Sequence, residues 1–170
     1  METVDVVVIG AGPVGENVAA RIVAGGLSAV VVEAELVGGE CSYWACMPSK
    51  AMLRSVHALR AAQRLPGVRE AVTGRLDVKA VLARRDDFTS HHDDSSQVAW
   101  LDGAGVTLVR GPGRLVGERS VVVNTPTGDV SLQARHAVVL ATGTTASIPP
   151  VPGLREAAPW TSREVTNADA

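Results

Sequence analysis

The strongest constraint on the fold is a glycine-rich turn between an expected strand and an expected helix. Residues 4–9 form a β-branched run that predicts a buried strand, and residues 13–24 carry helical patterning. Residues 28–32 predict a second strand, which completes a βαβ unit. The turn itself holds three glycines in G-x-G-x-x-G spacing, namely Gly10, Gly12 and Gly15. The sequence therefore predicts a Rossmann-like α/β fold, with a parallel sheet covered by helices.

The same turn predicts a nucleotide site. Gly10 permits a tight turn, Gly12 lets a pyrophosphate approach the backbone, and Gly15 lets the helix pack against the strand. Pro13 opens the helix, whose first N–H groups carry a partial positive charge that attracts the diphosphate. Glu33 ends the second strand, where its carboxylate can accept hydrogen bonds from ribose hydroxyls and repel a 2′-phosphate. The motif leaves FAD and NAD open, because both present an ADP moiety; the alternative is a βαβ unit whose glycines serve packing alone.

Length and charge narrow the class of protein. A chain of 170 residues fits one ordinary domain, and its formal net charge of −2 gives no electrostatic reason to bind nucleic acid or an anionic membrane. The first residues lack the basic stretch of a signal peptide, and no apolar run approaches the roughly 18–20 residues that span a bilayer. The sequence therefore predicts a soluble, cytoplasmic protein.

The cysteine content points to redox chemistry. The chain has two cysteines, Cys41 and Cys46, five positions apart. Metal is the weaker interpretation, because a zinc site needs four ligands and the four histidines are not spaced to supply the rest, so we expect no metal site. In a regular helix, residues five apart rise roughly 7.5 Å, too far for a disulfide. If the two are bonded, their segment is not one ideal helix; the alternative is a pair of buried, unreactive thiols.

The rest of the chain predicts further helices and a group of short strands. Residues 36–46 predict a loop, and residues 77–102 a helix in which His91-His92-Asp93-Asp94 is a solvated stretch. Another helix is expected over 49–65, strands over 106–109, 120–124, 130–133 and 137–140, and a hairpin turn over 125–129. Residues 148–153 are too rich in proline for a helix and predict an extended linker.

The segment around the cysteines resembles a known family. It reads Gly39-Glu40-Cys41-Ser42-Tyr43-Trp44-Ala45-Cys46-Met47-Pro48-Ser49-Lys50. This is similar to the G-G-T-C-x-x-x-G-C-[IVM]-P-S-K segment of the pyridine nucleotide–disulfide oxidoreductases, which include lipoamide dehydrogenase, glutathione reductase and mercuric reductase. Ala141-Thr142-Gly143 resembles the second FAD motif of these flavoproteins, and Gly111-Pro112-Gly113-Arg114 resembles the segment whose backbone borders the adenine. The resemblance covers most of the chain.

The resemblance implies an FAD-binding domain over residues 1–147, with a small antiparallel β-meander, and a linker into a missing NAD(P)-binding domain over 148–170. Cys46 would lie against the flavin, Cys41 would attack the substrate, and Lys50 would approach flavin N5. The resemblance further implies that the other FAD contacts come from Gly10, Gly12, Pro13, Gly15, Glu33, Gly39, Gly113, Arg114, Ala141, Thr142 and Gly143. Electrons would pass from NAD(P)H through FAD to a Cys41–Cys46 disulfide.

The resemblance also sets expectations for the whole protein. We expect this portion to be incomplete and not competent alone, the substrate to be a small molecule or a disulfide, and the complete protein to be a homodimer. Glu40, Ala45 and Tyr43-Trp44 depart from the family pattern around the interchange cysteine. The alternative is a stand-alone module that binds FAD or ADP without turnover; a simple NAD-dependent dehydrogenase would leave the cysteine segment unexplained.

Overall fold

The computed structural model describes residues 2–169, which form two compact units. The sheet unit comprises residues 2–40 and 93–144, and the helical unit comprises residues 41–92 and 145–169. Each unit is therefore built from two stretches that are distant in the sequence. The domain boundary expected between 147 and 148 stays a prediction.

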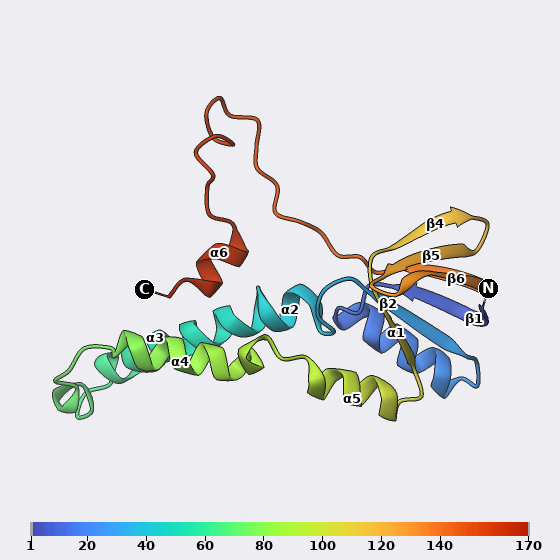
Figure 1. The fold of residues 1–170 in the computed structure, drawn as a ribbon. Coiled ribbons are helices and arrows are strands. Elements are labelled where there is room, and N and C mark those ends of the chain that lie inside the picture. Colours follow the sequence, from blue (N-terminus) through green and yellow to red (C-terminus); the bar gives the residue numbers. More distant parts are fainter. Residues whose placement is uncertain (1, 170) are drawn as a thin grey trace. The chain divides into compact units, whose positions relative to one another are not determined.

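The sheet unit confirms the expected α/β architecture. Its six strands lie in the order β3-β2-β1-β6-β5-β4, and the first four of these are parallel (Figure 1). β5 pairs antiparallel with both β4 and β6, and these three strands form the expected meander. The strands are β1 (Glu2–Ile9), β2 (Ala29–Glu33), β3 (Thr107–Arg110), β4 (Gly113–Gly117), β5 (Ser120–Thr125) and β6 (Gly128–Leu140).

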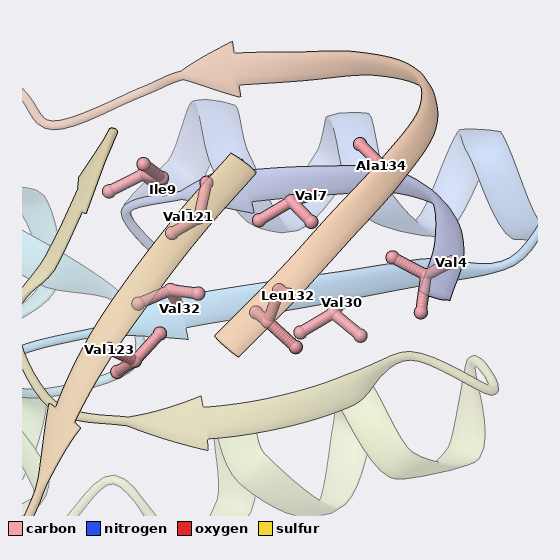
Figure 2. Close-up of a cluster of buried hydrophobic side chains, with 9 residues drawn as sticks. All are labelled: Val4, Val7, Ile9, Val30, Val32, Val121, Val123, Leu132 and Ala134. Carbon is pink, nitrogen blue, oxygen red and sulfur yellow. The ribbon is translucent and has the colours of Figure 1, made fainter. Parts of the chain in front are cut away.

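Alternating side chains of the strands build a core on each face of the sheet. On one face, Val7 and Val30 pack with side chains of β5 and β6, such as Val121 (Figure 2). On the other face, Val8 packs under α1 (Pro13–Ala24) and α5 (Ser95–Gly103). Strands buried on both faces require the nearly continuous valine runs that β1 and β2 contain.

The structure corrects the sequence-based prediction at the last strand. The strands expected over 130–133 and 137–140 are one strand, β6, with an irregular register opposite β1 between Val4 and Val6. One extra residue of β6 forms a bulge there, so the strand stays paired although the alternation of its side chains between the two faces shifts by one residue. β4 was not predicted. The hairpin expected over 125–129 is confirmed, with Thr125 paired to Gly128.

The helical unit contains α3 (Cys46–Arg64) packed on α4 (Val78–Phe88), and the short α6 (Ser162–Asn167) near the end of the chain. The single helix expected over 77–102 is wrong. It is interrupted at η2 (Ser90–His92), where three consecutive residues have positive φ, and a second short 3-10 helix, η1, spans Arg69–Ala71.

Two smaller differences concern the cysteine segment. The loop expected over 36–46 contains a helical turn, α2 (Gly39–Tyr43), and α3 begins at Cys46 rather than at residue 49. The proline-rich stretch over 148–153 has no helix or strand, as expected. Across residues 2–169, no helix has both the length and the apolar character that crossing a membrane requires.

Candidate functional site

The glycine turn connects β1 to α1 and is tightly packed at two of its three glycines. Gly10 has φ +102°, and a Cβ there would overlap the backbone carbonyl of Ala141. A Cβ at Gly15 would overlap the carbonyl oxygen of Gly10. These two positions therefore require glycine for the chain to fold in this way.

Gly12 differs from its two neighbours in the motif. A Cβ at Gly12 would meet no atom within 4 Å, and its φ of −73° is accessible to any residue. Gly12 is the N-cap of α1, and Pro13 follows at the start of the helix. Packing in the folded chain therefore does not require glycine at position 12, whereas close approach of a ligand to the backbone would require it.

Three further segments meet the turn within the sheet unit. The N–H of Ala141, directly after β6, donates to the carbonyl of Ile9 at 2.8 Å. The backbone nitrogen of Thr142 lies 3.1 Å from where a Gly10 Cβ would stand. Gly39 contacts the turn at Gly12, because a Cβ on Gly39 would lie 2.9 Å from the Cα of Gly12. The structure therefore brings Ala141, Thr142 and Gly39, three of the residues predicted to contact the cofactor, to the glycine turn.

Glu33 joins the end of β2 to the same turn. Its Oε2 accepts a hydrogen bond from the backbone N–H of Ala11 at 2.6 Å, and its Oε1 accepts one from the N–H of Glu35 at 2.8 Å. A carboxylate oxygen can accept more than one hydrogen bond, so Glu33 keeps capacity for a ligand hydroxyl. The two backbone bonds hold the carboxylate in one orientation.

Glu16 is a site residue that sequence reasoning missed. It lies in the first turn of α1 and is only 9% exposed. Burial, followed by the negative charge of Glu33, raises the pKa of Glu16 above its ordinary value. An acidic residue four positions after Gly12 was visible in the sequence, but nothing in the pattern said that it would be buried.

The remaining predicted cofactor residues of the sheet unit divide into two kinds. A Cβ on Gly113, the first residue of β4, would come 2.8 Å from Cγ1 of Val32, so this glycine fits against the core. Arg114 and Gly143 are exposed, and no described contact joins either to the glycine turn. Their predicted roles toward FAD stay predictions.

The cysteine segment is helical on both sides of a break. Cys41 lies in α2, Cys46 is the first residue of α3, and both are half-buried thiols. Between the helices, Ala45 has φ −135° and ψ −85°, which is not helical. The segment is therefore not one continuous helix, which is the condition that a disulfide between these residues requires. Lys50 is exposed one turn into α3.

An aromatic cluster lies beside the cysteines in the helical unit. The Trp44 ring contacts Tyr43, at 5.6 Å between centroids, and His92, at 5.7 Å, while the Arg163 guanidinium lies 4.1 Å from its centre. Tyr43 also stacks on His92. The expectation that His92 is solvated was therefore wrong: a half-buried imidazole packs against two aromatic rings. Among the residues that the structure describes, no group of three or more potential ligands could hold a metal ion.

The sheet-unit site fits an ADP-containing cofactor. The open side of Gly12 leaves room for a diphosphate at the start of α1, where helix N–H groups lack intrahelical partners. Glu33 lies at the carboxyl end of the neighbouring strand, at the position that binds a ribose in this type of site. The residues present therefore match the group that the motif implies.

Comparison with known proteins places this geometry in a family. The family model for pyridine nucleotide-disulphide oxidoreductases matches residues 4–170. The chain is 31% identical over 162 residues to a mercuric reductase of Acidithiobacillus ferrooxidans, covering 94% of this chain and 30% of the relative. It is 32% identical over 151 residues to a dihydrolipoyl dehydrogenase of Chlorobaculum tepidum, covering 88% of this chain and 32% of the relative.

A solved structure shares the fold. The HOCl-induced flavoprotein disulfide reductase RclA from Escherichia coli, in its Cu(II) complex, matches 98% of this chain and 35% of its own with a TM-score of 0.75 and 19% identity. The chain thus spans about a third of the length of these proteins. The match to the family model over nearly every residue is decisive: the chain belongs to the pyridine nucleotide-disulphide oxidoreductase family.

Proposed function

We propose that this chain is the FAD-binding, cysteine-bearing portion of an NAD(P)H-dependent flavoprotein disulfide oxidoreductase. The observation that carries the proposal is the meeting of Glu33, Gly39 and Ala141 at a glycine turn whose central glycine, Gly12, faces open space. Packing accounts for Gly10 and Gly15, whereas no clash explains glycine at position 12, where a closely approaching ligand would.

The residues of the sheet unit hold the adenosine end of the cofactor. The N–H groups at the start of α1 bind the diphosphate. The carboxylate of Glu33, which two backbone N–H groups hold in one orientation, accepts hydrogen bonds from the ribose hydroxyls. The same negative charge repels a 2′-phosphate at this site. FAD, when bound, supplies the transfer of an electron pair from NAD(P)H toward the cysteine pair.

The residues of the helical unit supply the thiol chemistry. Cys46 is the first residue of α3, and Lys50 follows one turn later on the same helix. Cys41 is the thiol that attacks the acceptor, a small molecule or a disulfide. The homodimeric state, the cytoplasmic location and the identity of the acceptor stay predictions for the whole protein.

A second candidate is a module that binds FAD or ADP without turnover. The observation in its favour is that every described contact of the glycine turn lies within the sheet unit, while both cysteines lie in the helical unit. Nucleotide binding at the glycine turn thus does not by itself require the two cysteines.

Calorimetric titration of the purified chain tests the nucleotide site. FAD and ADP should bind, and adenosine 2′,5′-bisphosphate should bind at least about tenfold more weakly because its 2′-phosphate faces Glu33. An anaerobic reductive titration of the FAD-loaded chain, with thiols counted by alkylation, then tests the redox role. Electron uptake by flavin and disulfide together supports the oxidoreductase, whereas uptake by flavin alone supports the binding module. Failure to bind either FAD or ADP overturns both.

A further inference from the structure

The short helix α6 contacts the chain between the two cysteines. The hydroxyl of Thr166, which is 7% exposed, lies 2.9 Å from the carbonyl oxygen of Trp44 and 2.8 Å from that of Ser162. Trp44 is one of the four residues between Cys41 and Cys46. A side chain 122 residues away thus hydrogen-bonds to the backbone of the cysteine segment.

The carbonyl of Trp44 has no helical donor, because Trp44 precedes the N-cap of α3 and Pro48 lacks an N–H. In a continuous helix, the carbonyl of residue 44 accepts from the N–H of residue 48, and proline has none. One residue later the ladder is intact, since the N–H of Ser49 donates to the carbonyl of Ala45 at 3.2 Å. The hydroxyl of Thr166, whose one hydrogen is shared between the carbonyls of Trp44 and Ser162, therefore offers Trp44 the donor that Pro48 lacks.

The side chain of Trp44 is held from the same helix. The guanidinium of Arg163 lies over its ring at 4.1 Å, a cation–π contact. Carbonyl and ring of the same residue are thus fixed by two residues of α6, one turn apart on the helix. Trp44 is therefore the residue through which α6 holds the cysteine segment.

The position of α6 is itself set by contacts, because an isolated helix of this length is unstable in water. Arg85 of α4, only 4% exposed, donates from one guanidinium nitrogen to the carbonyls of Thr166 and Ala168, at 3.2 and 2.6 Å. At the other end, Thr161 and Glu164 form a capping box. Both ends of α6 are therefore fixed when Thr166 reaches Trp44.

The geometry points to Thr166 as a positioning residue for the cysteine pair. Pro48 excludes a regular helix through residue 44. Thr166, with Arg163, holds Trp44 and so fixes the conformation of the break at Ala45, where φ and ψ are −135° and −85°. Without the break, the cysteines would stand roughly 7.5 Å apart along a helix, too far for a disulfide. This inference rests on the proposed redox role of the pair. In that role two thiols lose two electrons and two protons, and one S–S bond forms.

The test is the midpoint potential of the Cys41–Cys46 disulfide in the chain without cofactor. The protein is equilibrated anaerobically with mixtures of oxidised and reduced dithiothreitol, which supply and accept the electrons and protons, and thiols are trapped by alkylation and counted by mass. Thr166→Val keeps the side-chain shape without the hydroxyl. We expect it to lower the equilibrium constant for disulfide formation about fivefold, a shift of about 20 mV to less negative potential.

Matched variants separate the hydroxyl from general effects. Thr166→Ser retains the donor and should restore most of the wild-type potential. Thr73→Val removes a hydroxyl from an exposed position of the same unit and should leave the potential unchanged. If Thr166→Val does not fold, Arg163→Met decides the question, because it removes the cation over Trp44 and should shift the potential in the same direction.

The outcomes distinguish this inference from the proposed function. A wild-type chain that forms no intramolecular disulfide in any mixture overturns both the redox pair and its positioning. A wild-type chain that forms the disulfide, with a folded Thr166→Val variant of equal potential, overturns the positioning role alone. An equal shift in Thr166→Val and Thr166→Ser also overturns it, because packing rather than the hydroxyl would then be the cause.

Discussion

The carboxylate of Glu33 accepts a hydrogen bond from the backbone N–H of Ala11, with 2.6 Å between the two atoms. This bond joins the end of β2 to the turn after β1, across 22 positions of the sequence. Glu33 therefore has two tasks: it holds the glycine turn in shape, and it presents a fixed acceptor at the expected ribose position.

Replacing Glu33 should affect both tasks. In the native chain, each carboxylate oxygen of Glu33 accepts a hydrogen bond from a backbone N–H. In Glu33→Gln, the side-chain NH₂ replaces one of these oxygens and stands against a backbone donor. We expect ADP affinity to fall about tenfold and stability to fall by about 1–2 kcal/mol. Calorimetry and urea denaturation measure the two effects. Glu2→Gln, at the exposed far end of β1, is the control and should change neither; unchanged ADP affinity in Glu33→Gln would remove this residue from the site.

The glycines of the turn should separate folding from binding. Gly15→Ala places a methyl group onto the carbonyl oxygen of Gly10 and should destabilise the chain by about 3 kcal/mol. Gly12→Ala meets no atom within 4 Å and should cost about 1 kcal/mol or less, as an N-cap change. The same methyl group stands where a diphosphate approaches, so ADP binding should be lost in this stable variant. Full ADP affinity in Gly12→Ala would show that no ligand approaches there.

Local patterns predicted much of the sheet unit. The helix expected over 13–24 is α1 itself, because Pro13 and Gly25 mark its ends, and the valine runs of β1 and β2 were visible as buried strands. The break at η2 was not predictable, since Ser90–His92 contains neither glycine nor proline although all three residues have positive φ. The bulge in β6 was hidden because Arg135 and His136 interrupt its apolar run.

The cysteine site was predictable only in part. The spacing of Cys41 and Cys46 showed that a disulfide needs a broken helix, and the break is present at Ala45. The hydrogen bond between Thr166 and Trp44 holds this break in place, and these two residues are 122 positions apart in the sequence. No periodicity or motif relates residues at that distance, so only the folded chain brings them together.

Acid should weaken the link between β1 and β2 through Asp5. Its carboxylate accepts from the N–H and the hydroxyl of Ser28, both at 2.8 Å, and from Arg135 at 2.9 Å. These bonds, those of Ser28 first, hold the pKa of Asp5 well below its ordinary value of 3.8. A lowered pKa contributes stability above pH 3.8 that is lost as the pH falls toward the folded-state pKa.

Asp5→Asn tests this contribution. The variant should have a lower Tm than the wild type at pH 7, and the difference should shrink as the pH is lowered below 3.8. Thermal denaturation at a series of pH values measures it. Asp129→Asn, in the β5–β6 hairpin, is the comparison and should show a smaller difference at pH 7, because its carboxylate makes one described bond, to Asn124. A constant Tm difference down to pH 2 would contradict the prediction.

Glu16 should behave in the opposite sense. Its pKa is raised above 4.5 by burial and by Glu33, so the folded chain binds its proton more tightly than the unfolded chain does. The ionised side chain therefore destabilises the fold above the folded-state pKa, and this penalty disappears below pH 4.5. Glu16→Gln should raise the Tm at pH 7 and leave it unchanged at pH 4. Because the charge of Glu33 contributes to the shift, the gain from Glu16→Gln should be smaller in a Glu33→Gln background, and an equal gain in both backgrounds would show that the two carboxylates do not interact.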